Sequence, residues 1–162
     1  MKRLITKKLI AWKTQPNRKP LIVRGARQVG KSYIINEFGN GHFKGAVHII
    51  NFEKQPDWQR IFDLNLDINR IVSELEIILN KRITEGEDLL FLDEIQECPK
   101  AILALRYFFE QKPEMHVIAA GSLLEFALKD ISFPVGRVQL INMHPMNFYE
   151  YLFAVVKDLL DE

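Results

Sequence analysis

One octapeptide near the amino terminus combines the residue types and the spacing of a phosphate-binding loop. It matches the pattern G-x-x-x-x-G-K-S/T, and its residues are Gly25, Ala26, Arg27, Gln28, Val29, Gly30, Lys31 and Ser32. In such a loop, backbone N–H groups surround a polyphosphate, the lysine reaches the β- and γ-phosphates, and the serine hydroxyl ligates Mg²⁺. We therefore expect residues 25–33, which include Tyr33, to bind a nucleoside triphosphate.

Two adjacent acidic residues, Asp93 and Glu94, follow the apolar run at 89–92. In proteins with a phosphate loop, an acid that ends a buried strand helps to hold Mg²⁺. We expect Asp93 to bind Mg²⁺ directly or through water, and Glu94 to polarise the attacking water as a general base. An Asp-Glu pair favours ATP hydrolysis, whereas a lone Asp suits small-molecule kinases and GTPases. The structural alternative is an acid-rich surface turn.

Two further polar residues lie near other predicted strands. Ser122 follows a strand that ends at Ala120, so its hydroxyl could sense the γ-phosphate or orient the water; capping a helix at 123–129 is an equal alternative. Arg137, in a turn after Pro134, could stabilise charge on the transferring phosphoryl group, in cis or in a neighbouring subunit. A surface salt bridge explains this arginine equally well.

The elements that must position these residues alternate between strands and helices. The phosphate loop follows a strand at 21–23 and precedes a helix that should stop at the glycine-rich segment 39–41, so the positive end of the helix dipole faces the phosphates. Further strands are expected at 46–52, 89–92, 116–120 and 138–141. Further helices are expected at 2–13, 67–83 (with Asp67 as N-cap), 100–111, 123–129 and 147–158. This alternation predicts an α/β fold with a largely parallel, doubly wound sheet.

Composition indicates one globular domain. The chain has 162 residues, of which 48% are hydrophobic and 27% charged, and no apolar stretch approaches the ~18 residues of a membrane helix. The single cysteine, Cys98, cannot form an internal disulfide, which suits a reducing cytoplasm. We therefore expect a cytoplasmic protein that does not associate with a membrane.

The charge is distributed unevenly along the chain. Of the 22 Lys and Arg residues, ten lie within residues 1–36, which contain no Asp or Glu. A positive field around a polyphosphate explains this asymmetry most simply. The alternative is a nucleic-acid surface on the basic N-terminal segment, which we disfavour because no aromatic residues are interleaved with the charges.

Five strings taken together resemble a large group of prokaryotic AAA-type ATPases of largely unknown function. They are residues 25–32, Leu92–Gln96, Ala120–Ser122, Gly136–Arg137 and His144–Glu150. The resemblance implies a three-layer P-loop NTPase of the additional-strand type, with a mainly parallel five-stranded sheet in the order 5-1-4-3-2 and helices on both faces. It also implies ATP and Mg²⁺ as ligands, and sensor or finger roles for Ser122 and Arg137. If the arginine acts in trans, self-association would supply it.

Members of that group usually continue into a helical region and a C-terminal domain of unknown function. We therefore expect a single ATPase core over 1–162: a basic N-terminal helix and linker (1–19), a nucleotide-binding sheet (20–142), and the truncated start of a helical lid (143–162). The expected function is Mg²⁺-dependent ATP hydrolysis coupled to a conformational change in a partner domain. The alternative is a nucleotide-binding switch with little or no hydrolysis in this shorter form.

Overall fold

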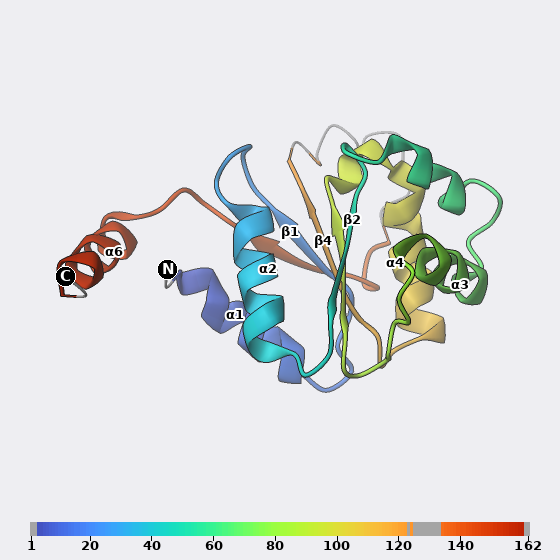
Figure 1. Ribbon diagram of the computed structural model, residues 1–162, viewed down its shortest axis with the longest axis horizontal. Helices are drawn as coiled ribbons and strands as arrows, with labels where there is room; N and C mark the ends of the chain where they lie inside the picture. Colours follow the sequence, from blue (N-terminus) through green and yellow to red (C-terminus); the bar gives the residue numbers. More distant parts are fainter. Residues whose placement is uncertain (1–2, 123, 125–133, 161–162) are drawn as a thin grey trace.

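Five parallel strands form a single sheet in the order β2-β3-β4-β1-β5, which confirms the order expected from the resemblance (Figure 1). The computed structural model describes residues 3–122, 124 and 134–160. The strands are β1 Leu21–Arg24, β2 Val47–Asn51, β3 Leu89–Asp93, β4 His116–Gly121 and β5 Gln139–Asn142. The helix expected at 123–129 falls outside the described residues except at position 124.

Helices cover both faces of the sheet, with α1 and α2 on one face and α3 and α4 on the other (Figure 1). The α-helices with described bounds are α1 Leu4–Thr14, α2 Lys31–His42, α3 Ile68–Leu79, α4 Pro99–Gln111 and α6 Phe148–Leu160. The short 3₁₀ helices η1 Pro56–Phe62 and η2 Ile95–Glu97 were not expected from the sequence. No helix in the described part of the chain is long and apolar enough to cross a bilayer.

The apolar runs form strands that are buried on both faces. In β3, Leu90 and Leu92 pack into the core beneath α3 and α4, while Leu89 and Phe91 pack into the core beneath α1 and α2. Successive side chains of a strand point to opposite faces, so a run without polar interruptions fills both cores. This double burial fixes the central strands and, with them, the edge at which their carboxyl ends meet.

Two helix ends, those of α2 and α3, differ clearly from the sequence-based expectation, and the other described helix ends lie within two residues of it. Helix α2 does not stop at Gly39 but continues to His42. Gly39 instead allows close packing of the helix on β2, since a Cβ there would lie 2.5 Å from Cγ2 of Val47. Helix α3 ends at Leu79 and not at Ile83, since Asn80 adopts the left-handed conformation (φ 49°) that closes a helix. Its beginning is as expected, with Asp67 Oδ1 accepting hydrogen bonds from the backbone of Asn69 and Arg70.

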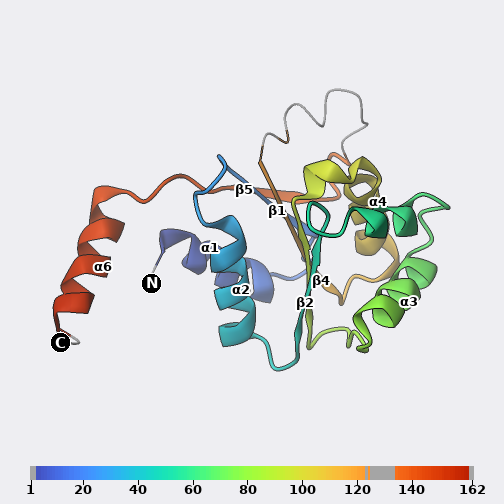
Figure 2. The same cartoon turned by 45° about the horizontal axis from the view of Figure 1, so that its top comes forward.

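Helix α6 lies apart from the sheet, beyond the stretch that follows β5 (Figure 2). Its first turn is tied to the start of α1, where Glu150 Oε1 accepts hydrogen bonds from Arg3 Nε (3.1 Å) and Leu4 N (2.8 Å). Several of its aromatic side chains are exposed, Phe153 by 73%.

Candidate functional site

The phosphate loop joins β1 to α2 at the carboxyl edge of the sheet. Its backbone is curled by left-handed residues, with φ of 62° at Gln28 and 89° at Gly30. The loop starts against the chain that follows β5: Met143 N donates to Arg24 O (2.7 Å), and a Cβ on Gly25 would lie 2.2 Å from Met143 O. A glycine is therefore required at position 25 for close backbone contact and at position 30 for its dihedral angle.

Lys31 begins α2 and lies inside the loop. It is only 6% exposed, and its ammonium donates to the carbonyl oxygens of Gly25 (3.0 Å) and Ala26 (2.8 Å). Burial lowers the pKa of Lys31, and Arg27 acts in the same direction, while the nearby carboxylates of Glu94 and Asp93 oppose the shift. The loop lysine is thus held between backbone oxygens and faces the acidic pair.

Asp93, the last residue of β3, meets the loop through Ser32. Asp93 is 5% exposed, and it lines the same cavity as Ser32. Its carboxylate accepts a hydrogen bond from Asn51 Nδ2 (3.1 Å), and Asn51 lies beside it in register on β2. Burial raises the pKa of Asp93, and the adjacent Glu94 adds to the rise. The two residues expected to hold Mg²⁺, Ser32 and Asp93, therefore line one cavity.

The donor set at Ser32 and Asp93 fits Mg²⁺. The ion prefers oxygen ligands, retains several waters and often uses one or two carboxylates together with phosphate oxygens. Among the residues with described positions, no group of three or more His, Cys, Asp and Glu side chains could hold a metal. A cavity of about 390 Å³ opens beside these two residues and is also lined by Tyr33 and Asn51. A cation here would offset the cost of the buried Asp93 charge.

Glu94 stands in a tight turn between β3 and η2. Its backbone is left-handed (φ 51°, ψ 46°), and its N–H donates to Asp93 Oδ1 (3.1 Å). Its Oε2 accepts a short hydrogen bond from Gln96 Nε2 (2.6 Å). The conformation of Glu94 costs on the order of 1 kcal/mol for a residue with a side chain, as found at many functional sites.

Ser122 directly follows β4, which lies between β1 and β3. The phosphate loop, Asp93 and Ser122 therefore share one edge of the sheet, as expected from the sequence. Ser122 is 1% exposed, and its hydroxyl has no hydrogen-bond partner within the described residues. Helix capping by Ser122 concerns residues outside the described part of the chain.

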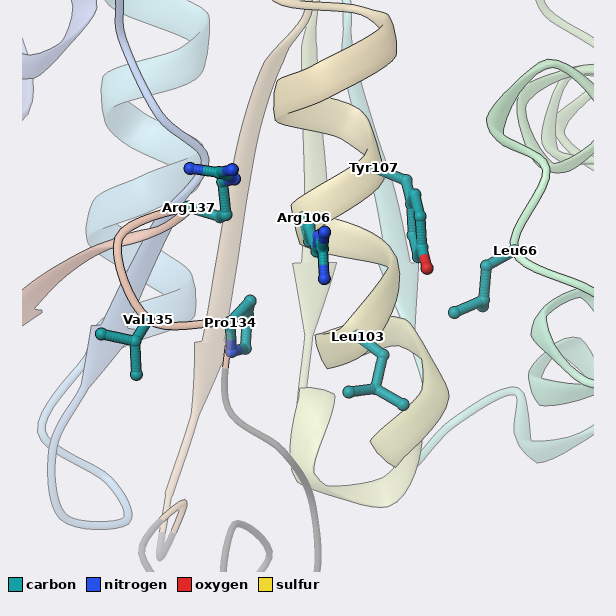
Figure 3. Close-up of a pocket in the computed structure, with 7 residues that line it drawn as sticks. All are labelled: Leu66, Leu103, Arg106, Tyr107, Pro134, Val135 and Arg137. Carbon is teal, nitrogen blue, oxygen red and sulfur yellow. The ribbon is translucent and has the colours of Figure 1, made fainter.

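Arg137 does not join this site in its own chain. It lies just before β5, whose first residue, Gln139, pairs with Leu21 at the start of β1, so Arg137 is at the opposite edge of the sheet from the phosphate loop. Its Nε donates to Glu110 Oε1 (2.9 Å), and its side chain is 47% exposed. It borders a pocket of about 570 Å³ together with Arg106 and Tyr107 of α4 (Figure 3). The expectation of a finger role in cis is therefore wrong, and the salt bridge expected as its alternative is present.

Two residues that contact the acidic pair were not expected from the sequence. Asn51 and Gln96 were noted only as members of a strand and of a motif string, yet each hydrogen-bonds one of the two acids. Asn51 is a polar residue at the end of an apolar strand, and this pattern indicates a position at the carboxyl edge of a parallel sheet, where ligands bind. The local sequence offers no comparable signal for Gln96.

Comparisons with known proteins agree with this fold. A family model described as an AAA domain matches residues 17–152. An uncharacterised protein of Methanocaldococcus jannaschii is 29% identical over 133 residues, which make up 81% of this chain and 27% of that protein. The chain therefore spans about a quarter of the length of this relative.

Solved structures share the fold. A Walker-type ATPase of Pyrococcus abyssi aligns with a TM-score of 0.61 at 18% identity, over 96% of this chain and 57% of that one. The structure of Drosophila ORC bound to DNA aligns with a TM-score of 0.59 at 13% identity, over 95% of this chain and 46% of that one. The structure of AMPPCP-bound DnaA from Aquifex aeolicus aligns with a TM-score of 0.56 at 15% identity, over 98% of this chain and 49% of that one. At these identities, the likeness concerns the fold alone.

Proposed function

This chain belongs to the family of AAA domains, and on that premise we propose that it binds ATP together with Mg²⁺ and hydrolyses the ATP. One observation carries the proposal: Ser32 and Asp93 line one cavity beside the enclosed Lys31, which brings the phosphate loop and the acidic strand end into one site. These are the groups that phosphoryl transfer from a nucleotide requires.

The phosphate loop would bind the polyphosphate through its backbone N–H groups at the start of α2. Lys31 would contribute the positive charge, and its position between Gly25 O and Ala26 O keeps its ammonium within the loop. Ser32 and Asp93 would hold Mg²⁺, which when bound neutralises charge on the phosphate oxygens. Tyr33 borders the adjoining cavity, where it would limit access of water to the ion.

Glu94 would accept the proton of the attacking water. A carboxylate is a suitable general base when it lies next to the reacting phosphate, and the turn after β3 presents Glu94 beside Asp93. Ser122, buried at the same edge with an unpartnered hydroxyl, would contact the γ-phosphate or the attacking water. Positioning and charge stabilisation together would supply the catalysis.

Arg137 would act only from a second copy of the chain. It is exposed on a surface far from its own phosphate loop, which supports a role at the site of a neighbouring subunit. In that case, turnover per chain should rise with protein concentration, and Arg137→Ala should abolish this dependence. A concentration-independent rate in the wild type would contradict the trans role.

Coupling to a partner domain would start at the loop. The chain after β5 contacts Gly25 through Met143 and continues into α6, which lies apart from the sheet (Figure 2). A change in the loop on nucleotide binding would therefore be passed to α6. We infer that α6 is the first element of the helical region that responds to the nucleotide.

The direct test combines thermal denaturation with phosphate release, using ATP and ADP with and without Mg²⁺. Ligand at 100 times its Kd should stabilise the fold by about 2.7 kcal/mol, with ATP·Mg²⁺ also yielding phosphate. Stabilisation by ATP without phosphate release would favour the nucleotide switch over the ATPase. A melting temperature that neither nucleotide changes would contradict both.

A further inference from the structure

We propose that Gln96 is a positioning residue that ties Glu94 to the end of β4 that carries Ser122, so that γ-phosphate contact at Ser122 sets the orientation of Glu94. The inference rests on the proposed ATP hydrolysis at this edge of the sheet. It gives the two residues a physical connection, although they come from different strands.

The side chain of Gln96 bridges the two strand ends. Its Nε2 donates to Glu94 Oε2 (2.6 Å), and its Oε1 accepts from Ser122 N (3.3 Å). A carboxylate oxygen only accepts and a backbone N–H only donates, so these partners permit a single orientation of the amide. A glutamine is the uncharged side chain that offers a donor and an acceptor at this length.

Close packing prevents Gln96 and the end of β4 from moving independently. A Cβ on Gly121 would lie 2.6 Å from Gln96 Oε1 and 3.0 Å from Leu124 Cδ2. The amide oxygen therefore occupies the space that a side chain at position 121 would need. A shift of residues 121 and 122 must displace the amide that holds Glu94.

Ser122 has a physical reason to shift when a ligand arrives. Its hydroxyl is buried and lacks a partner within the described residues, so a phosphate oxygen or a bound water at this edge would relieve a desolvation cost. Its N–H bond to Gln96, at 3.3 Å, is slightly longer than the normal range for such bonds. Movement of Ser122 toward a ligand would thus alter the same bond.

Glu94 is the group most sensitive to this displacement. Its backbone is held in a left-handed turn, and its carboxylate has one hydrogen bond within the described residues, from Gln96. A charge-assisted bond of this length is a strong restraint on the carboxylate. The direction of the general base therefore depends on the position of the Gln96 amide.

Two isosteric variants separate the two hydrogen bonds. Gln96→Met keeps the length of the side chain but loses both bonds. Gln96→Glu keeps an acceptor for Ser122 N and places a second carboxylate against Glu94. Gln111→Met, at the exposed end of α4, is the matched control for loss of a glutamine amide.

The first measurement is single-turnover phosphate release together with the Kd for ATP. We expect both Gln96 variants to slow release by about 10- to 100-fold, the loss of one charge-assisted hydrogen bond, with the Kd within about 2-fold of the wild type. Ser122→Ala should cost less in the Gln96→Met background than in the wild type, because only the direct contact of Ser122 with the ligand remains to be lost. A purely structural role would weaken ATP binding and the rate together.

The second measurement does not need hydrolysis. In the ¹⁵N-labelled chain, the side-chain amide signal of Gln96, assigned by its absence in Gln96→Met, should shift with a non-hydrolysable ATP analogue and not with ADP. Equal shifts with both nucleotides, or a wild-type rate in Gln96→Met, would overturn the inference. If the wild type binds ATP but releases no phosphate, the ATPase proposal fails, and the amide signal still decides whether Gln96 responds to the γ-phosphate.

Discussion

The environment of Asp93 gives the clearest indication that this site binds a cation. A carboxylate that is 5% exposed, with a pKa raised by burial and by its neighbour Glu94, destabilises a fold unless a cation accompanies it. Its hydrogen bonds from Asn51 Nδ2 and Glu94 N do not neutralise it. A buried charge that lowers stability, such as that of Asp93 at the end of a central strand, is typical of a residue with a functional role.

Asp93→Asn should separate stability from function. The amide removes a buried charge but replaces one of the two accepting oxygens with a donor, which loses the hydrogen bond from Glu94 N or from Asn51 Nδ2. Because the two effects oppose each other, the free energy of unfolding without ligand should change by less than about 1 kcal/mol. Mg²⁺ should no longer increase the affinity for ATP, as measured by titration calorimetry. Asp57→Asn, at an exposed position, is the control. An unaltered Mg²⁺ effect in Asp93→Asn would argue against this residue as a ligand of the ion.

Lys31→Ala should weaken ATP binding because the loop loses its buried cation. We expect the Kd to rise about 100-fold, the loss of charge-assisted bonds to phosphate. The exposed Lys44, replaced in the same way, should leave the Kd unchanged. Fluorescence titration with a labelled ATP would measure both, and equal Kd values in the two variants would contradict the role of Lys31.

At the scale of elements, the sequence predicted the strands and the order of the motifs, because both depend on local apolar runs and loop residues. It was less accurate where a distant contact decides the outcome. Gly39 looked like a helix stop, but its role depends on Val47 of β2. The contact between Gln96 and Ser122 depends on the neighbouring positions of β3 and β4. The place of Arg137 was predictable, since a residue just before a parallel strand lies at the edge away from the site.

Two glycines of α2 allow a matched test of this packing. Gly39→Ala should lower the free energy of unfolding by about 1–3 kcal/mol, because its Cβ would press on Val47. Gly41→Ala meets no atom within 4 Å and should raise it by up to about 0.5 kcal/mol through helix propensity. Urea denaturation measures both. Destabilisation of similar size in the two variants would show that the contact with β2 is unimportant.

At the scale of the whole molecule, two apolar cores hold the sheet on its two faces. The carboxyl edge of the sheet carries the left-handed Glu94 and the Ser122 hydroxyl, which has no partner within the described residues. The core beneath α1 and α2 also contains a titratable group, His116, whose ring meets Trp12 and Phe43 edge-on. Burial lowers the pKa of His116 from its ordinary 6.5 to about 4, and the cations Arg18 and Lys13 reinforce the shift. The folded protein therefore resists protonation of this ring.

His116 should make the fold sensitive to mild acid. Between pH 6.5 and 4 the unfolded chain binds a proton that the folded chain does not, so stability is fully present above pH 6.5 and is lost as the pH falls toward 4. We expect roughly 2 kcal/mol of this loss to disappear in His116→Phe, measured by denaturation at several pH values. His144→Asn, at an exposed position, should keep the wild-type slope. Equal slopes in His116→Phe and the wild type would refute this account of the core.

In the proposed reaction, Glu94 activates water for attack on a bound ATP. The most direct measurement is single-turnover phosphate release from saturating ATP·Mg²⁺ by the wild type, by Glu94→Gln, and by the exposed control Glu97→Gln. We expect Glu94→Gln to slow release by about 100-fold or more while the Kd for ATP stays within about 3-fold, and Glu97→Gln to match the wild type. Release by Glu94→Gln at the wild-type rate would contradict the claim.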